Sequence, residues 1–158
     1  LAQVVTQVEG ILLSDGRRVS YSADQLDFGY RHSVLMDAGV VIAQATRALT
    51  SGDPEAIRAR MEECARARRE KQPLNLPSAG STFKRPEGFF AAKLIDDCGL
   101  RGLTVGGAQV SEKHAGFVVN IGGATARDML ELMRQVEQRV FEQTGVQLEP
   151  EVRILGTD

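Results

Sequence analysis

Hydrophobic and β-branched positions divide the chain into a strand-rich first third and a longer region of mixed helix and strand. Residues 3–13 form an aliphatic run, and Asp15 and Gly16 separate it from a second run at 17–21. An Asp-Gly pair between two such runs predicts a β-hairpin, because both turn positions tolerate positive φ. A third aliphatic run at 40–49 predicts a strand that is buried on both faces over part of its length.

The segment that begins at Asp53 predicts a basic amphipathic helix that ends near Gln72. An acid at the N-cap followed by proline is typical of a helix start, because the N–H that proline lacks has no partner there. Apolar residues recur at helical spacing on one face and are expected to be buried: Ile57, Met61, Cys64 and Ala65. The charged opposite face indicates exposure to solvent, and a partner surface is the alternative.

The rest of the chain predicts an α+β order, with a boundary from the first region near Ser51-Gly52. The expected elements are helices over 89–98 and 125–144, and strands over 104–111, 116–121 and 146–155. The second helix should start at a capping box of Thr125 and Asp128. Its expected buried stripe consists of Met129, Met133, Val136, Val140 and Phe141. Pro150 interrupts the last strand and favours an edge position or a bulge.

Composition and charge narrow the function class. The chain has 158 residues, 42% of them hydrophobic and 25% charged, as in soluble globular proteins. Its net charge of -2 argues against nucleic-acid binding, and no apolar run approaches the roughly 20 residues of a membrane-spanning helix. Cys64 and Cys98 lack metal-ligand spacing, so we expect reduced, partly buried thiols and no metal site. Because the chain opens at Leu1 in a strand-like run, we expect a fragment of a longer protein.

The segment 77–86 is the strongest candidate for a binding site. Prolines at both ends stop a helix from running through it, and Gly80 permits a sharp turn. The hydroxyls of Ser78, Ser81 and Thr82 precede two cations, Lys84 and Arg85. Hydroxyls beside cations suit an anionic ligand, since the cations neutralise its charge and the hydroxyls orient it. From these residues alone, a surface turn with a basic tip is the alternative.

Four motifs follow one another along the chain. They are Gly-Tyr-Arg-His-Ser at 29–33, Ser-Ala-Gly-Ser-Thr-Phe-Lys-Arg-Pro at 78–86, Gly-Gly-Ala-Gln-Val-Ser-Glu-Lys-His-Ala-Gly-Phe at 106–117 and Glu-Pro-Glu-Val-Arg at 149–153. Together they resemble the motifs of the UDP-N-acetylenolpyruvoylglucosamine reductase family, MurB, and are closest to its shorter type II variant. The resemblance implies an α+β substrate-binding domain at 52–158, preceded at 1–51 by the last strands of a FAD-binding domain of the PCMH type.

The resemblance implies a bacterial, cytoplasmic oxidoreductase of peptidoglycan precursor synthesis. In the family, NADPH reduces FAD, and hydride then passes to C3 of the enolpyruvyl group of UDP-N-acetylglucosamine-enolpyruvate, which becomes UDP-N-acetylmuramate. The expected partners are this substrate and NADPH, with no nucleic acid, no membrane and no second subunit. The family's glycine- and asparagine-rich flavin-binding segments do not occur here. The cofactor-binding residues are therefore unknown, and the chain alone is expected to be inactive.

Residues in all four motifs match functional positions of the family. Ser81 matches the proton donor to C2, Arg31 the partner of the substrate carboxylate, and Glu151 the acid that stabilises the enolic intermediate. The expected substrate-binding residues are Tyr30, Lys84, Arg85, Gln109, Lys113 and His114. Some of these residues have a simpler interpretation. Ser81 would bond its own turn, and Arg31 would stack on the Tyr30 ring. Glu151 would pair with Arg153, and His114 would be a structural histidine.

Two other functions stay open at this level. A non-catalytic nucleotide-sugar-binding module would use the same basic loop without flavin. An interaction domain would use the helix over 53–70. Flavin binding and NADPH oxidation by a longer form distinguish the reductase from the first, and loss of a partner after charge reversal at Arg58 and Arg66 tests the second.

Overall fold

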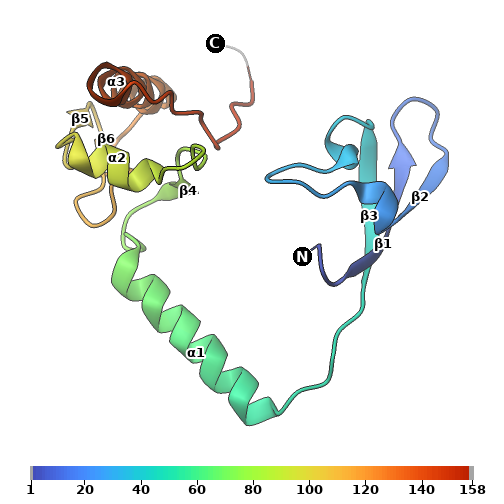
Figure 1. Ribbon diagram of the computed structural model, residues 1–158. Helices are drawn as coiled ribbons and strands as arrows, with labels where there is room; N and C mark the ends of the chain where they lie inside the picture. Colours follow the sequence, from blue (N-terminus) through green and yellow to red (C-terminus); the bar gives the residue numbers. More distant parts are fainter. Residues whose placement is uncertain (1, 157–158) are drawn as a thin grey trace. The chain divides into compact units, whose positions relative to one another are not determined.

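The computed structural model describes residues 2–156, so the opening Leu1 lies outside the described residues. The chain divides after Ile57 into two compact units. Unit 1 contains a small antiparallel sheet, and unit 2 combines a second sheet with helices (Figure 1). The division falls in the first turn of helix α1 (Pro54–Lys71), slightly beyond the predicted boundary at Ser51-Gly52. The assignment of 1–51 and 52–158 to different domains stays a prediction.

Unit 1 is built on the predicted hairpin. Strand β1 (Val5–Leu12) pairs antiparallel with β2 (Arg18–Ser22), and Gly16 in the turn has φ 73°. Strand β3 (Val40–Arg47) pairs with the other edge of β1, which gives the order β2-β1-β3. The hairpin is confirmed, and so is the presence of a strand in the aliphatic run at 40–49.

The predicted burial of β3 is wrong. Its residues after Val40 are exposed, with Val41 and Ile42 at 53% and 54%. Within the described part of unit 1, only Val8 and Leu26 are buried hydrophobic residues. The sheet is accompanied by two short 3-10 turns, η1 (Asp24–Leu26) and η2 (Val34–Met36). So few neighbouring side chains cannot cover both faces of three strands.

Helix α1 begins and ends as predicted, but it buries no side chain. Asp53 Oδ2 accepts a hydrogen bond from the Ala56 N–H at 3.0 Å, as expected for an N-cap. Ile57 and Met61 are 50% and 67% exposed, and the Cys64 thiol is exposed as well. The predicted buried face is therefore wrong, because no described helix or strand packs extensively against α1. Cys98 is half-buried as predicted.

Unit 2 contains an antiparallel sheet with the order β4-β7-β6-β5. Its strands are β4 (Ser78–Ser81), β5 (Thr104–Val105), β6 (Ala108–Val110) and β7 (Phe117–Asn120). The single strand predicted over 104–111 is wrong, because β5 and β6 form a tight hairpin that turns at Gly106 and Gly107. Gly106 has φ 53°, and a Cβ at Gly107 would lie 2.4 Å from the Ala124 main-chain nitrogen, so the turn requires glycine.

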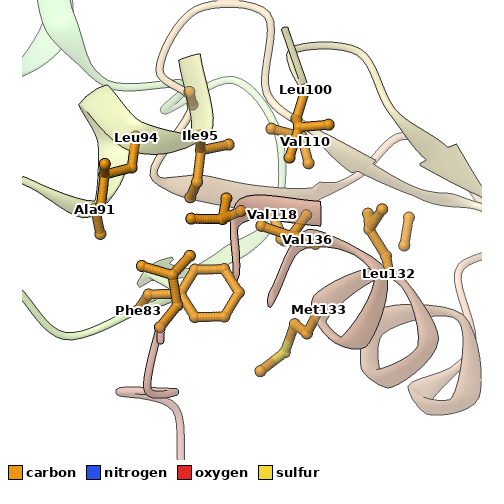
Figure 2. Packing of buried hydrophobic residues seen from close by; sticks show 14 residues of the cluster. Phe83, Ala91, Leu94, Ile95, Leu100, Val110, Val118, Leu132, Met133 and Val136 are labelled. Carbon is orange, nitrogen blue, oxygen red and sulfur yellow. The ribbon is translucent and has the colours of Figure 1, made fainter. Parts of the chain in front are cut away.

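Two helices pack with this sheet to form the core of unit 2. Helix α2 (Ala91–Asp97) confirms the prediction over 89–98, and Gly99 after it has φ 68°. Figure 2 shows Leu94 and Ile95 from α2 close to Val118 of β7, with residues of the other helix, α3 (Ala126–Thr144), on the far side of the cluster. Main-chain pairing therefore holds the strands together, and one apolar cluster packs the sheet against both helices.

Helix α3 is the most accurately predicted element. Thr125 Oγ1 accepts from the Asp128 N–H at 3.1 Å, and Asp128 Oδ2 accepts from the Thr125 N–H at 2.9 Å, which completes the capping box. These hydrogen bonds hold the pKa of Asp128 below its ordinary value. Met133, Val136 and Val140 are buried as predicted, whereas Phe141 is 51% exposed and Leu132, which the pattern missed, is fully buried.

The C-terminal segment does not form the strand predicted over 146–155. Pro150 makes one isolated bridge with Phe83, and the neighbouring residues have no regular structure. Proline has no N–H to donate, so it cannot extend the pairing into a regular ladder.

Candidate functional site

The candidate segment 77–86 forms the edge strand β4 instead of the loop that its prolines suggest. β4 pairs antiparallel with β7, with Ser78 opposite Val119 and Ser81 opposite Phe117. The register shifts between these two pairs, and Gly80 lies within the shift with φ 87°. The sharp turn expected at Gly80 is therefore wrong: the strand continues through Gly80 with an irregularity in its pairing. Ser81 is exposed at the edge of the sheet.

Thr82 follows Ser81 and is 3% exposed. Its N–H donates to the Gly116 carbonyl oxygen at 2.9 Å, and its hydroxyl Oγ1 accepts from the Val118 N–H at 3.0 Å. Its carbonyl oxygen accepts from the Glu151 N–H at 2.8 Å. Thr82 thus connects the end of β4, strand β7 and the C-terminal segment.

The C-terminal motif lies beside the candidate segment. The Lys84 N–H donates to the Glu149 carbonyl oxygen at 2.8 Å, and Phe83 and Pro150 form the bridge between the two segments. In addition, Lys84 Nζ lies 3.0 Å from Glu149 Oε2. Residues 65 positions apart in the chain are thereby paired, and Glu151 is bonded to the residue that follows Ser81.

The side chain of Arg85 is oriented by the turn before α2. Its Nε donates to the Phe89 carbonyl oxygen at 3.2 Å, and its guanidinium carbon lies 3.9 Å from the centroid of the Phe90 ring. A cation over an aromatic face is attracted to it, and this contact lowers the entropy that the side chain loses on binding a ligand. Lys84 differs, because its ammonium is shared with a carboxylate and presents less net charge to an anion.

Gln109 lies on β6, away from the other candidate residues. The pairing places Gln109 opposite Val119, and Val119 is paired on its other side with Ser78. Two strand spacings, about 10 Å, therefore separate the main chain of Gln109 from β4. Gln109 Nε2 donates to Thr104 Oγ1 at 3.1 Å, which gives the amide a structural contact.

The loop between β6 and β7 carries Lys113 and His114. Ser111 is 3% exposed, and its Oγ accepts from the N–H groups of Lys113 and His114 at 3.2 and 3.3 Å. Lys113 Nζ donates to the Arg69 carbonyl oxygen at 2.7 Å, near the end of α1. His114 Nδ1 accepts from the Gly116 N–H at 3.2 Å, as the structural interpretation of this histidine requires.

Arg101 fixes the same loop from the end of α2. Its Nη2 donates to Asp96 Oδ2 at 2.9 Å, and its Nη1 donates to the Glu112 carbonyl oxygen at 2.6 Å. The hydrogen bonds from Arg101 hold the pKa of the Asp96 carboxyl below its ordinary value. Sequence analysis missed Arg101 and Ser111. It also expected the Thr82 hydroxyl to serve a ligand, whereas the structure buries this hydroxyl against Val118. The Ser111 turn is a local signal that could have been found, whereas Arg101 and Thr82 bond main-chain atoms far away in the sequence.

Tyr30 and Arg31 belong to unit 1. Arg31 has φ 54°, which is uncommon for a residue other than glycine, and it lies in a tight turn closed by a bridge between Gly29 and His32. Its guanidinium carbon lies 5.6 Å from the centroid of the Tyr30 ring, and that ring is 63% exposed. The stacked arrangement expected of a surface arginine is thus present. A joint site of Arg31 with Ser81, which lies in the other unit, stays a prediction.

An apolar groove of about 560 Å³ opens between β4, α3 and the C-terminal segment. Neither Lys84 nor Arg85 lines it. Its lining includes Ser78, Thr82, Val118, Met129, Met133, Val152 and Leu155. The groove therefore lacks the cations that a diphosphate requires.

No cofactor-binding residue is assigned among the described residues. Between residues 2 and 156, no group of three or more His, Cys, Asp or Glu side chains is placed to hold a metal ion. None of the helices described in that range combines the length and apolar character needed to cross a membrane.

A family model described as "UDP-N-acetylenolpyruvoylglucosamine reductase, C-terminal domain" matches residues 72–155, which include the motifs at 78–86, 106–117 and 149–153. The chain belongs to this family. The MurB fold is confirmed by a solved structure, the UDP-N-acetylenolpyruvylglucosamine reductase (MurB) from Thermus caldophilus. It is similar with a TM-score of 0.80 and 39% sequence identity, over 96% of this chain and 53% of that chain.

Curated MurB relatives extend the match through unit 1. The UDP-N-acetylenolpyruvoylglucosamine reductase of Pediococcus pentosaceus is 53% identical over 158 residues, which cover 100% of this chain and 52% of that protein. The reductase of Clostridium novyi is 48% identical over 158 residues, with coverage of 100% and 51%. This MurB chain therefore spans about half the length of the curated relatives it matches.

Proposed function

We propose that this chain is the substrate-binding part of a reductase that converts UDP-N-acetylglucosamine-enolpyruvate into UDP-N-acetylmuramate with NADPH and FAD. The term whole reductase is used below for a protein of the relatives' length that contains residues 1–158. The proposal rests on the main-chain pairing of 82–84 with 149–151, because it joins two family motifs beside the exposed Ser81. The relatives' names supply the substrate and the reaction class, reduction of UDP-N-acetylenolpyruvoylglucosamine, and the resemblance to the family supplies NADPH and FAD.

In this proposal, residues 52–158 supply most of the substrate-binding residues. Residues 1–51 complete a FAD-binding domain and contribute Tyr30 and Arg31 to substrate binding. The main FAD site is proposed to lie in another part of the whole reductase, because the family's glycine- and asparagine-rich flavin-binding segments do not occur in residues 1–158. The whole reductase is further proposed to be a bacterial monomer of peptidoglycan precursor synthesis. A cytoplasmic location fits a substrate that is a soluble nucleotide sugar.

The reaction adds a hydride to C3 and a proton to C2 of the enolpyruvyl group. Reduced FAD supplies the hydride in the chemistry of the family. Ser81 Oγ is the proposed source of the proton, which solvent then replaces. A hydroxyl is a weak acid, so close approach and a fixed direction are essential. The pairing of Ser81 with Phe117 and the burial of the next residue, Thr82, provide that fixed backbone.

Negative charge that develops on the enolate and its carboxylate needs stabilisation. Arg31 suits the carboxylate, because a guanidinium offers two parallel hydrogen bonds and keeps its charge. Glu151 is the proposed stabiliser of the enolate, either by donating a hydrogen bond or by acting through a cation. The remaining proposed substrate ligands are Tyr30, Lys84, Arg85, Gln109, Lys113 and His114. Among the cations, Arg85 is the best prepared, since the Phe90 ring already orients it.

Stopped-flow kinetics of Ser81→Ala in the whole reductase test this function. NADPH should reduce FAD at the wild-type rate, because that step does not involve C2. Reoxidation of the flavin by the enolpyruvyl substrate should slow by about 10²–10⁴-fold, as for a lost general acid. Ser78→Ala alters the other serine of β4 and should reoxidise normally.

Each contrary result has a distinct meaning. Normal reoxidation by Ser81→Ala would mean that the proton comes from another group. A wild-type whole reductase that binds the nucleotide sugar but does not oxidise NADPH would favour the non-catalytic binding module.

A further inference from the structure

We propose that Thr82 is a positioning residue that holds Ser81 and Glu151 in register with each other. The inference rests on the proposed function, because it concerns the same site. Among the described residues, the buried polar ones are Thr82 and Ser111, each 3% exposed. A buried hydroxyl is retained at little cost only where it makes hydrogen bonds, so its partners indicate its role.

The hydroxyl of Thr82 takes the place of a main-chain acceptor. In a regular antiparallel pair, the N–H groups of one strand donate to carbonyl oxygens of the other. The register of β4 and β7 shifts around Gly80, and the Val118 N–H donates to Thr82 Oγ1 at 3.0 Å. Val118 is only 7% exposed, so removal of the hydroxyl would leave this N–H without a partner in a buried part of the sheet.

The main chain of Thr82 connects to both proposed catalytic residues. Ser81 is its immediate neighbour, and the Glu151 N–H donates to the Thr82 carbonyl oxygen at 2.8 Å. On the opposite side, the Thr82 N–H donates to the Gly116 carbonyl oxygen at 2.9 Å. A displacement of Thr82 therefore moves Ser81 through the chain and Glu151 through the hydrogen bond. Thr82 lines the apolar groove but is only 3% exposed, so its proposed role is to act through these neighbours.

Thr82→Val and Thr82→Ser separate positioning from simple packing. Valine keeps the shape of threonine and removes the acceptor, whereas serine keeps the acceptor. In the whole reductase, Thr82→Val should lower kcat on the order of a hundredfold, because a misplacement of about 1 Å has an effect of this size. KM for the enolpyruvyl substrate should change little, and NADPH should reduce FAD at the wild-type rate. Thr82→Ser should restore kcat.

Thr144→Val is the matched control. Thr144 Oγ1 donates to the Val140 carbonyl oxygen at 2.7 Å at the end of α3. The same chemical change is thus made in the same unit, away from β4 and the C-terminal motif. It should leave kcat and KM at their wild-type values.

Amide hydrogen exchange of residues 1–158 reports on the hydrogen bonds around Thr82 without an activity assay. Thr82→Val should speed exchange at the amides of Val118 and Glu151, and Thr82→Ser should not. If the valine variant does not fold, Thr82→Cys replaces it. Sulfur is a weaker hydrogen-bond acceptor than oxygen, so the kcat of the cysteine variant should fall below that of the serine variant.

Three results would overturn the inference: a folded Thr82→Val enzyme with wild-type kcat, equal losses in the serine and valine variants, or equal slowing of both half-reactions. Wild-type kcat in the cysteine variant, together with altered exchange at Val118, would also overturn it. An inactive wild-type whole reductase would instead overturn the proposed function, so the two failures are distinguishable.

Discussion

Replacement of Glu149 by glutamine removes the carboxylate that lies 3.0 Å from Lys84 Nζ. If Lys84 binds the diphosphate of the substrate, this carboxylate competes with the substrate for the same ammonium group. Glu149→Gln should then lower KM for the enolpyruvyl substrate in the whole reductase, and Lys84→Met should raise it. The main-chain pairing of 82–84 with 149–151 does not involve the Glu149 side chain, so it should persist in both variants.

The exposure of the pair limits the size of this effect. The side chains of Lys84 and Glu149 are 43% and 67% exposed. Two unit charges at this distance attract by about 1.4 kcal/mol in bulk water. Side-chain entropy and screening by salt reduce the net stabilisation from an exposed ion pair to about 0.2–1 kcal/mol. Glu149→Gln should therefore lower KM by no more than about fivefold, since a tenfold change corresponds to about 1.4 kcal/mol.

A double-mutant cycle over Lys84→Met and Glu149→Gln, read as KM at low and moderate salt, is the assay. Lys93→Met is the matched control, because Lys93 forms a similar exposed pair with Asp97 at 2.9 Å on α2. It should leave KM unchanged. If both site variants shifted KM in the same direction, or if their coupling were well above about 1 kcal/mol, Lys84 would act by holding the C-terminal segment and not as a ligand.

Two further predictions concern the stability of unit 2. Leu132→Ala should lower the free energy of unfolding in urea by about 2–5 kcal/mol, because Leu132 is 0% exposed, and Phe141→Ala, at 51% exposed, should have a much smaller effect. An equal effect of both would contradict the described core. Hydrogen bonds from Arg134 and Gln135 lower the pKa of Glu131 to about 2. Its contribution to stability is therefore present above its ordinary pKa, about 4.3, and lost as the pH falls toward the lowered value. The melting temperature of Glu131→Gln should therefore fall less steeply than that of the wild type as the pH is lowered. Glu142→Gln, on the same helix, should follow the wild type.

The sequence predicted elements whose signals are local. Asp53 caps α1 by a bond to an N–H three residues later, and Thr125 and Asp128 cap α3 in the same way. Burial depends on other segments and was less predictable. The apolar face of α1 has helical spacing but no described element to pack against, and the turn at Gly107 is enforced by Ala124.

The candidate site was predictable only as residue identities. Motif resemblance singled out Ser81 and Glu151, but their proximity depends on the bridge between Phe83 and Pro150, which no local pattern encodes. The strand character of 78–81 was missed because two prolines and small residues are typical of loops. Those prolines lie outside β4, at Pro77 and Pro86, so they do not remove a hydrogen bond from its pairing.

The contacts of the candidate residues support our proposal that the site lies at the edge of the unit 2 sheet. Gln109 already donates to Thr104, and His114 already accepts from Gly116, so both are engaged in the fold before any ligand binds. Ser81, by contrast, is exposed on the edge strand. The C-terminal motif reaches this edge through one bridge and its flanking main-chain bonds. Leu148 and Val152 pack into the core of unit 2 on either side of Glu151. Between these two anchors, the position of the Glu151 main chain depends on its hydrogen bond to Thr82.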